Sequence, residues 1–343
     1  MSPPVLLSSR HADLSFPMKS NNITKKFAAW PLWKKLAVVG IVLIIVIPLS
    51  VGLGVGLSRG GDNDDDDGSS DDSNENTPEN TPNRTSLWQP EVGATWQIIL
   101  LKPLEISDED KITPDVEIFD LDLYDNDAST FATLKKQGKK VICYFSAGSW
   151  EDWRDDKDDF DKADLGKELD GWPGERWLNV SSPNVHSIMK KRIEMAAKKG
   201  CDAIDPDNVD GFQNENGLKL TKKDTVNFVK FLSQTAASFN MSTGLKNAGS
   251  VISDVISDVH FSVNEQCVEY SECDTFAQFI DHGKPVFHIE YPKGAGKKVS
   301  TKTASGICSG KGKADGSSGF STVIKKMNLD KWVEYCNGTT YGS

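Results

Sequence analysis

From Trp96 onward, short apolar runs alternate with stretches that carry hydrophobic residues at helical spacing. An apolar run bounded by polar residues and glycine is typical of a buried strand. Eight such runs predict strands at Trp96–Leu101, Val116–Asp122, Lys140–Ser146, Ala203–Asp207, Ser242–Lys246, Val259–Asn264, Pro285–Tyr291 and Ser321–Lys325. Repeated strand–helix units favour a parallel sheet, and eight of them in about 240 residues favour a closed (β/α)8, TIM-like barrel over an open sheet.

Helices are predicted between most of these strands, at Ala128–Gln137, Val185–Lys199, Thr221–Asn240 and Asp274–His282. The third has the clearest signals. Thr221 can cap its first turn, Asp224 follows three residues later, and apolar residues then recur at helical spacing. The α/β alternation therefore extends over most of the chain after Trp96.

A different pattern stands near the N-terminus, where Leu36 to Leu57 form 22 consecutive residues without a charge. A helix of that length spans about 33 Å, enough to cross a bilayer core of about 30 Å. Six basic residues and one acid precede it, so we expect a cytoplasmic N-terminus and an extracellular C-terminal part, the type II single-pass topology. The alternative is a cleaved signal peptide, but this run is longer than the usual core of about 7–15 residues and starts far from Met1.

Charge divides the chain into three parts. Residues 1–59 carry +6 and residues 60–87 carry −8, so residues 88–343 must carry −9 to reach the total of −11. The middle part has one leucine among Asp, Ser, Asn, Thr and Pro, and we expect a disordered acidic stalk. The predicted parts are a cytoplasmic tail (1–35), a membrane anchor (36–57), the stalk (58–87) and a (β/α)8 barrel domain (88–343). The sequence leaves open whether a protease cuts the stalk and releases the barrel. We expect the protein to be a monomer.

All six cysteines lie on the predicted outer side, which favours disulfide bonds. Six cysteines allow 15 pairings. Closeness in sequence favours Cys267 with Cys273, and we also predict Cys308 with Cys336. Cys143 and Cys201 lie in apolar, strand-like contexts, where we expect buried free thiols. Glycosylation sequons at Asn83, Asn179, Asn240 and Asn337 agree with the topology.

Polar residues lie at or just after the ends of six of the predicted strands. They are Asp120 and Asp122, Ser146, Asp205 and Asp207, Lys246 and Asn247, Glu265, and Glu290 with Tyr291. In a parallel barrel these strand ends converge on one face, where barrel enzymes place their active sites. The pattern therefore predicts a site at that face.

Two carboxylates on apolar strands, Asp207 and Glu265, are our candidate catalytic pair. Two such groups facing one cavity suit glycoside hydrolysis, in which one stays ionised and the other donates a proton to the leaving oxygen. Several aromatic residues near strand ends suit sugar stacking: Tyr144, Trp150, Trp153, Trp172, Trp177 and Tyr291. For each tryptophan, packing in the core is an equally good interpretation.

Other chemistries fit less well. The stretch DPDNVDG (205–211) resembles a calcium loop only loosely, because its glycine is one place late and Asn216 stands where the bidentate glutamate would be. The histidines are scattered, no phosphate loop or GxSxG motif occurs, and the acidity argues against nucleic acid. We expect no cofactor and no metal.

Seven stretches, in order, resemble glycoside hydrolase family 114 and especially its fungal endo-α-1,4-galactosaminidases. They are TWQIILLKPL (95–104), DLDLYD (120–125), KKVICYFSAGSWEDWR (139–154), WLNVSSPNV (177–185), KGCDAIDPDNVDGFQNENGLKLT (199–221), GLKNA (244–248) and NEQCVEYSEC (264–273). The resemblance covers about Leu87 to Cys336. It implies a (β/α)8 barrel that cleaves α-1,4-linked galactosamine polymers, with Asp207 and Glu265 as the catalytic pair.

The substrate that this resemblance implies is a polycation, and an acidic barrel would attract it. We expect Asp120, Asp122, Asp125 and Asp205 to contact its ammonium groups, although the family usually has glutamate at the position of Asp205. Lys246 would keep Asp207 ionised. The remaining expected substrate contacts are Tyr144, Ser146, Trp150, Asn208, Asn247, Glu290 and Tyr291.

We assign Asp207 as the nucleophile and Glu265 as the acid/base of an endo-acting, retaining glycosidase. Two alternatives remain at this stage. A non-catalytic, cell-surface polysaccharide-binding barrel would use the same cleft without needing both carboxylates. A structural cell-wall protein would show no saturable sugar binding.

Overall fold

The computed structural model describes residues 87–109, 111–297 and 299–342. The predicted tail, anchor and all but the end of the predicted stalk lie outside these ranges. Among the residues that the structure describes, no helix has the length and apolar character needed to cross a bilayer.

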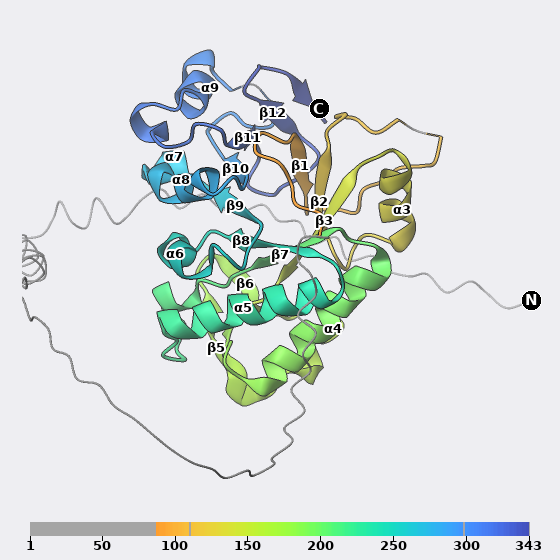
Figure 1. The fold of residues 1–343 in the computed structure, drawn as a ribbon, viewed down its shortest axis with the longest axis vertical. Helices are drawn as coiled ribbons and strands as arrows, with labels where there is room; N and C mark the ends of the chain where they lie inside the picture. The colour runs from red at the N-terminus through yellow and green to blue at the C-terminus, as the bar shows by residue number, and fades with distance from the viewer. Residues whose placement is uncertain (1–86, 110, 298, 343) are drawn as a thin grey trace, which may run out of the picture. The chain divides into compact units, whose positions relative to one another are not determined.

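Eight parallel strands occur where the sequence predicts them (Figure 1). They are β1 (Trp96–Ile99), β2 (Ile118–Asp122), β3 (Lys140–Ser146), β7 (Ala203–Asp207), β8 (Ser242–Lys246), β9 (Phe261–Glu265), β10 (Val286–Glu290) and β11 (Ser321–Ile324). Their order in the sheet follows their order in the chain, and each is parallel to its neighbour. The sheet then continues through two antiparallel strands, β12 (Val333–Tyr335) and β13 (Thr340–Tyr341).

The sheet curls until β1 meets β11, and side chains rather than a backbone ladder bridge this junction. The Trp96 indole nitrogen donates to the Ser321 carbonyl at 2.7 Å, and the Ser321 hydroxyl donates to the Ala94 carbonyl at 2.7 Å. Lys325, fully buried, donates to the Gln97 side chain at 2.9 Å. Burial lowers the pKa of Lys325 to about 7. The fold is a curled α/β sheet of the TIM-like barrel type, and these contacts link its first strand to β11.

Helices follow most of the strands, and the predicted ones are all present. The helices are α3 (Ala128–Lys136), α4 (Pro183–Lys199), α5 (Lys222–Ser238), α6 (Ile252–Val255), α7 (Cys267–Tyr270), α8 (Cys273–Asp281) and α9 (Thr301–Cys308). The predicted capping box at α5 is confirmed: the Asp224 amide donates to the Thr221 hydroxyl oxygen, and the Thr221 amide donates to the Asp224 carboxylate.

Alternate residues of each strand face the barrel interior. One buried apolar cluster fills the interior toward the amino ends of the strands and includes Trp96, Ile118, Phe261 and Phe287. A second, larger cluster packs the outer face of the strands against the helices. Gly244 is required in this interior, because a Cβ there would lie 2.4 Å from a ring carbon of Phe261.

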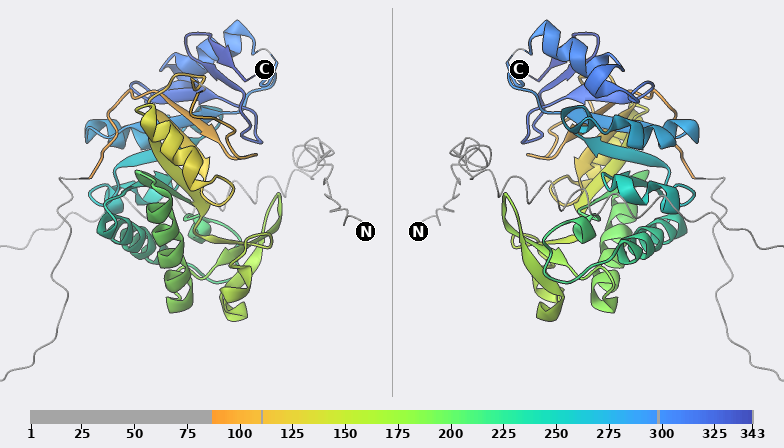
Figure 2. Two further views of the ribbon diagram at one scale, coloured as in Figure 1. Left: turned by 90° about the vertical axis from the view of Figure 1, so that its right-hand side faces the viewer. Right: turned by 90° about the vertical axis from the view of Figure 1, so that its left-hand side faces the viewer.

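Three strands form a second sheet that the sequence did not predict. They are β4 (Ser149–Glu151), β5 (Leu165–Leu169) and β6 (Trp172–Leu178), in the order β4–β6–β5. The segment lies between β3 and α4, so it leaves the barrel at the carboxyl end of a strand. Figure 2 shows it as the yellow-green segment beside α4.

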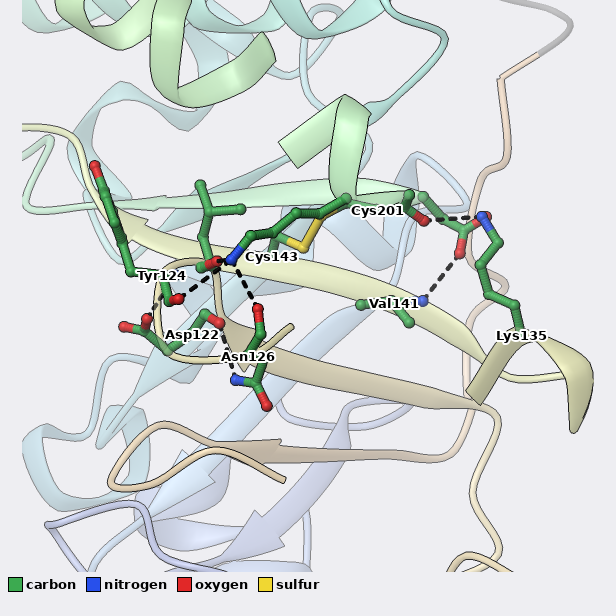
Figure 3. The surroundings of a disulfide bond; sticks show 11 residues. Asp122, Tyr124, Asn126, Lys135, Val141, Cys143 and Cys201 are labelled. Atoms are coloured by element: carbon green, nitrogen blue, oxygen red, sulfur yellow. Dashed lines mark hydrogen bonds and ion pairs between the residues drawn. A yellow bond between two sulfur atoms is a disulfide. The ribbon is translucent and has the colours of Figure 1, made fainter. Parts of the chain in front are cut away.

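Three disulfide bonds pair all six cysteines. Cys267–Cys273 and Cys308–Cys336 confirm the predicted pairs. The prediction of free thiols at Cys143 and Cys201 is wrong: these residues form the third disulfide, with Cα atoms 6.0 Å apart (Figure 3). An apolar strand context does not distinguish a thiol from a disulfide, because both are commonly buried.

Candidate active site

The charged residues of the barrel interior gather above its apolar cluster, at the carboxyl ends of the strands. Asp205 and Asp207 share the inward face of β7 with Ala203, and Glu265 shares that of β9 with Val263. Lys246 projects from β8, between those two strands. The ε-ammonium of Lys246 donates to Asp207 Oδ2 at 2.9 Å and lies 3.2 Å from Glu265 Oε2.

One lysine thus bridges the two candidate catalytic carboxylates and limits the distance between them. Their facing oxygens can be no further apart than those two distances placed end to end, about 6 Å. The Lys246 side chain is 2% exposed, whereas those of Asp207 and Glu265 are 15% and 23% exposed. A substrate can therefore reach the carboxylates, while the cation lies behind them.

Asp207 has two further hydrogen-bond donors. The Tyr144 hydroxyl donates to Oδ2 at 3.0 Å, and the backbone amide of Asn208 donates to Oδ1 at 2.7 Å. Burial, followed by the charge of Asp207, raises the pKa of Tyr144 far above its ordinary value. The phenol therefore keeps its proton and remains a hydrogen-bond donor to Asp207.

Glu265 is surrounded in a similar way. The Asn247 side-chain amide donates to Oε2 at 3.1 Å, and the Tyr291 hydroxyl donates to Oε1. Burial alone would raise the pKa of Glu265, but Lys246, Tyr291 and Asn247 outweigh it and hold the pKa below its ordinary value. Glu265 is therefore ionised at neutral pH in the free protein.

The backbone has positive φ directly after each of these three strand ends. Asn208 has φ 61°, Asn247 has φ 47° and Gln266 has φ 63°. Non-glycine residues rarely adopt this region, and such residues concentrate at functional sites. Asn208 and Asn247 also donate to neighbouring site residues, so the backbone that leaves each strand helps to hold the carboxylates.

Asp120 and Asp205 form a second carboxyl pair deeper in the barrel. Both are fully buried, and all four of their carboxyl oxygens lack a donor among the described residues. Burial first, and then the charge of Asp205, raise the pKa of Asp120 well above its ordinary value. The pKa of Asp205 rises to about 7, chiefly through burial. Burial therefore favours the protonated form of both carboxyl groups.

Glu175, on β6 of the second sheet, is a site residue that sequence reasoning missed. The Ser149 hydroxyl donates to its carboxylate at 2.8 Å, and the Asn208 side-chain amide donates to Ser149 at 3.0 Å. Burial, with the charges of Glu151 and Asp207, raises its pKa to about 7. Burial alternates over 174–177 in the structure, but this stretch is too short for a strand to be predicted from its sequence.

Four of the predicted substrate contacts lie near the edge of the site or bond to other protein groups, and their contact with a substrate stays a prediction. Asp122 is buried against Arg154 at 2.7 Å and also accepts from backbone amides, whereas Asp125 is half-exposed at the edge. The Trp150 indole donates to the Lys157 carbonyl at 2.9 Å. The Ser146 hydroxyl accepts from Asn208 at 3.2 Å.

Glu290 is not brought together with the other predicted residues. Its neighbour Ile289 belongs to the interior cluster, so Glu290 faces the helices. Its carboxylate accepts from the Val268 amide at 2.7 Å and lies 3.0 Å from His288 Nε2. The alternation of side chains along β10 already excludes Tyr291 and Glu290 from sharing a face.

One cluster within the described ranges has metal-ligand spacing, namely Cys267, Cys273 and His288. Its two sulfur atoms are bonded to each other, so it offers no thiolate. The carboxylates of Asp207 and Glu265 accept hydrogen bonds from Lys246 and from neighbouring tyrosine and asparagine groups of the protein.

Comparison with known proteins gives a family match and several similar structures. Residues 77–341 match the sequence profile of the glycoside-hydrolase family GH114. The structure of Aspergillus fumigatus Ega3 in complex with galactosamine is 55% identical, covers 73% of this chain and 97% of that one, and has a TM-score of 0.68. The glycoside hydrolase domain of PelA from Pseudomonas aeruginosa shares the fold at 12% identity, covers 69% of this chain and 96% of that one, and has a TM-score of 0.52. No curated protein gave a significant match.

Proposed function

Because the chain belongs to the glycoside-hydrolase family GH114 and is therefore a glycosidase, we propose that it cleaves α-1,4-linked galactosamine inside a cationic polysaccharide, with retention of configuration. The observation that carries this proposal is the spacing of Asp207 and Glu265 around Lys246. Retaining enzymes place their carboxyl groups about 5–5.5 Å apart, and inverting enzymes about 6.5–9.5 Å apart to admit a water. The facing oxygens of Asp207 and Glu265 are at most about 6 Å apart, and this close approach supports the retaining arrangement.

The chemistry then runs in two steps. The Asp207 carboxylate attacks the anomeric carbon while the bond to the leaving oxygen breaks, and Glu265 gives that oxygen its proton. Glu265 then takes a proton from water, which displaces Asp207 from the sugar. Since Glu265 is ionised in the free protein, it must gain a proton as the substrate excludes water from its carboxylate.

The substrate class rests on charge and on similarity. Residues 88–343 carry −9, and acidic groups crowd the open end of the barrel, so a polymer bearing ammonium groups is attracted to the site. Ega3, 55% identical over nearly all of its own chain, was crystallised with galactosamine. Neutral polysaccharides lack this electrostatic attraction.

The test is incubation of the protein with a partly deacetylated α-1,4-galactosamine polymer, with product sizes followed by mass spectrometry. We expect a ladder of short oligomers, absent with Glu265→Gln and kept with the control Glu269→Gln, an exposed residue on α7. Azide added as an external nucleophile distinguishes the nucleophile from the acid/base residue. An acid/base variant should yield a glycosyl azide of retained configuration, and a nucleophile variant one of inverted configuration. Intact polymer that stays bound to the protein would instead indicate the non-catalytic barrel.

We also propose that residues 36–57 anchor the protein in the plasma membrane, with the barrel outside and monomeric. The three disulfides suit an oxidising compartment. Two sequon asparagines, Asn240 and Asn337, are exposed, whereas the amide of Asn179 donates to Asp164 at 3.0 Å. Protease treatment of intact cells should release the barrel and leave the N-terminal tail protected.

A further inference from the structure

The second sheet, together with its turns, forms an arm over residues 149–178 beside the active site. The arm begins directly after β3 and returns to the barrel before α4. Ser149, at its base, is fully buried and bonded to Asn208, the residue after Asp207. The arm thus starts at the catalytic centre, and its outer part is the yellow-green segment in Figure 2.

The four tryptophans of the arm fall into two classes. Trp177 is 7% exposed and Trp150 is half-buried with its indole nitrogen bonded to a carbonyl, so these two hold the arm together. Trp153 and Trp172 are 52% and 55% exposed, and both rank among the few large apolar side chains at the surface of the described residues. About half of each indole surface is therefore open to solvent, and two such side chains in one short segment offer apolar surface for a ligand.

The strand register places these two exposed indoles at the same end of the arm. β4 pairs antiparallel with β6, and the Asp152 amide donates to the Gly174 carbonyl at 3.0 Å just beyond the last pair. Trp153 follows Asp152, and Trp172 precedes Gly174 by two residues. Four residues of extended chain separate Ser149 from Trp153, at most about 13 Å. That span corresponds to a few sugar units along a polymer.

Acidic charge is concentrated in this same segment. Residues 149–178 hold eleven acidic and five basic residues, a net charge of −6 out of the −9 of residues 88–343. Several of these acids are exposed, namely Asp152, Asp155, Glu168 and Asp170. The arm therefore offers carboxylates beside exposed aromatic faces, the two groups that an amino sugar engages through its ammonium and its C–H surface.

We propose that this arm is an accessory binding surface for the polymer, where Trp153 and Trp172 stack on galactosamine units outside the cleavage site and the arm's carboxylates attract their ammonium groups. The proposal rests on the proposed function and extends it. The arm would raise the affinity for long chains without changing the chemical step, because neither indole belongs to the carboxylate network around Lys246.

The experiment compares a long, deacetylated galactosamine polymer with the shortest oligomer that the enzyme cleaves. The variants are Trp153→Ala, Trp172→Ala and both together, with Tyr270→Ala as an exposed aromatic control outside the arm. For the double variant we expect KM on the polymer to rise about tenfold, as two stacking contacts would give. On the short oligomer, kcat/KM should stay within about twofold of the parent.

A second set of variants isolates charge. Asp155→Asn, Glu168→Gln and Asp170→Asn together should reduce the salt dependence of polymer binding, and should have no effect on an N-acetylated, uncharged polymer. Unchanged polymer KM in the indole double variant would overturn the proposal, as would an equal loss on the short oligomer. If the parent protein cleaves neither substrate, the proposed function itself fails, whatever the arm does.

Discussion

Replacing Lys246 by methionine tests the site most directly, because this ammonium lies between the two carboxylates. Methionine has a similar length but no charge. Without the cation, two ionised carboxylates within about 6 Å of each other would repel by about 3 kcal/mol at an effective dielectric constant of about 20. This repulsion corresponds to about 2 pKa units. The change disfavours the doubly ionised pair, so the pKa of one carboxyl group must rise.

The assay is the pH dependence of kcat/KM on a short galactosamine oligomer. We expect the acidic limb of the profile to move about 2 units toward higher pH, together with a fall in kcat at neutral pH. Lys313→Met, at an exposed lysine whose Nζ donates to the Glu269 carbonyl, is the control and should leave the limb in place. An unshifted limb in a folded Lys246→Met protein would refute the claim that this lysine sets the ionisation of the pair.

Four further outcomes follow from individual contacts. Tyr291→Phe removes a donor to Glu265, so the pKa of Glu265 should rise and the pH–rate profile should shift in the same direction as for Lys246→Met. Burial and the charge of Asp207 raise the pKa of Asp210 to about 6, so the stability that the protonated group contributes is complete below about pH 4 and is lost as pH rises through 6. In the parent protein this loss lowers the free energy of unfolding by up to about 3 kcal/mol, and urea denaturation of Asp210→Asn should show a decrease smaller by that amount. Gly244→Ala should destabilise the barrel by about 1–3 kcal/mol in the same assay, and an unchanged midpoint would contradict the close contact with Phe261. Replacing Cys143 and Cys201 by alanine opens a loop of 58 residues and should lower the free energy of unfolding by about 4 kcal/mol, whereas a change below 1 kcal/mol would indicate that the crosslink is dispensable.

The strands and the principal helices were predictable because their signals are local. Apolar runs, a capping box at Thr221 and glycine at a helix end each act within a few residues. The convergence of Asp207, Lys246 and Glu265 was also predictable, since parallel strands must bring their carboxyl ends together. Their mutual hydrogen bonds were not, because rotamers and burial depend on the whole barrel.

The arm was missed because its sequence is dominated by charge, which resembles a solvated loop. Several of those charges are in fact buried: Arg154 contacts Asp122 and Glu151, and Arg192 on α4 contacts Asp156. The pairs Arg154–Asp122 and Arg192–Asp156 join residues that are 32 and 36 positions apart, and such pairs have no periodic signature in the sequence. The same holds for Cys143 and Cys201, which are brought together by the pairing of β3 with β7.

That disulfide also sets the limits of an exchangeable module. Cys143 lies in β3 and Cys201 just before β7, so the crosslink brackets the arm and α4 in one covalent loop. A protease cut within the arm would leave both halves attached to the barrel. Insertions or replacements between the two cysteines would likewise leave the register of the neighbouring strands anchored. Changes in the segment between Cys143 and Cys201 would therefore alter how such an enzyme binds its substrate, while the catalytic barrel stays unchanged.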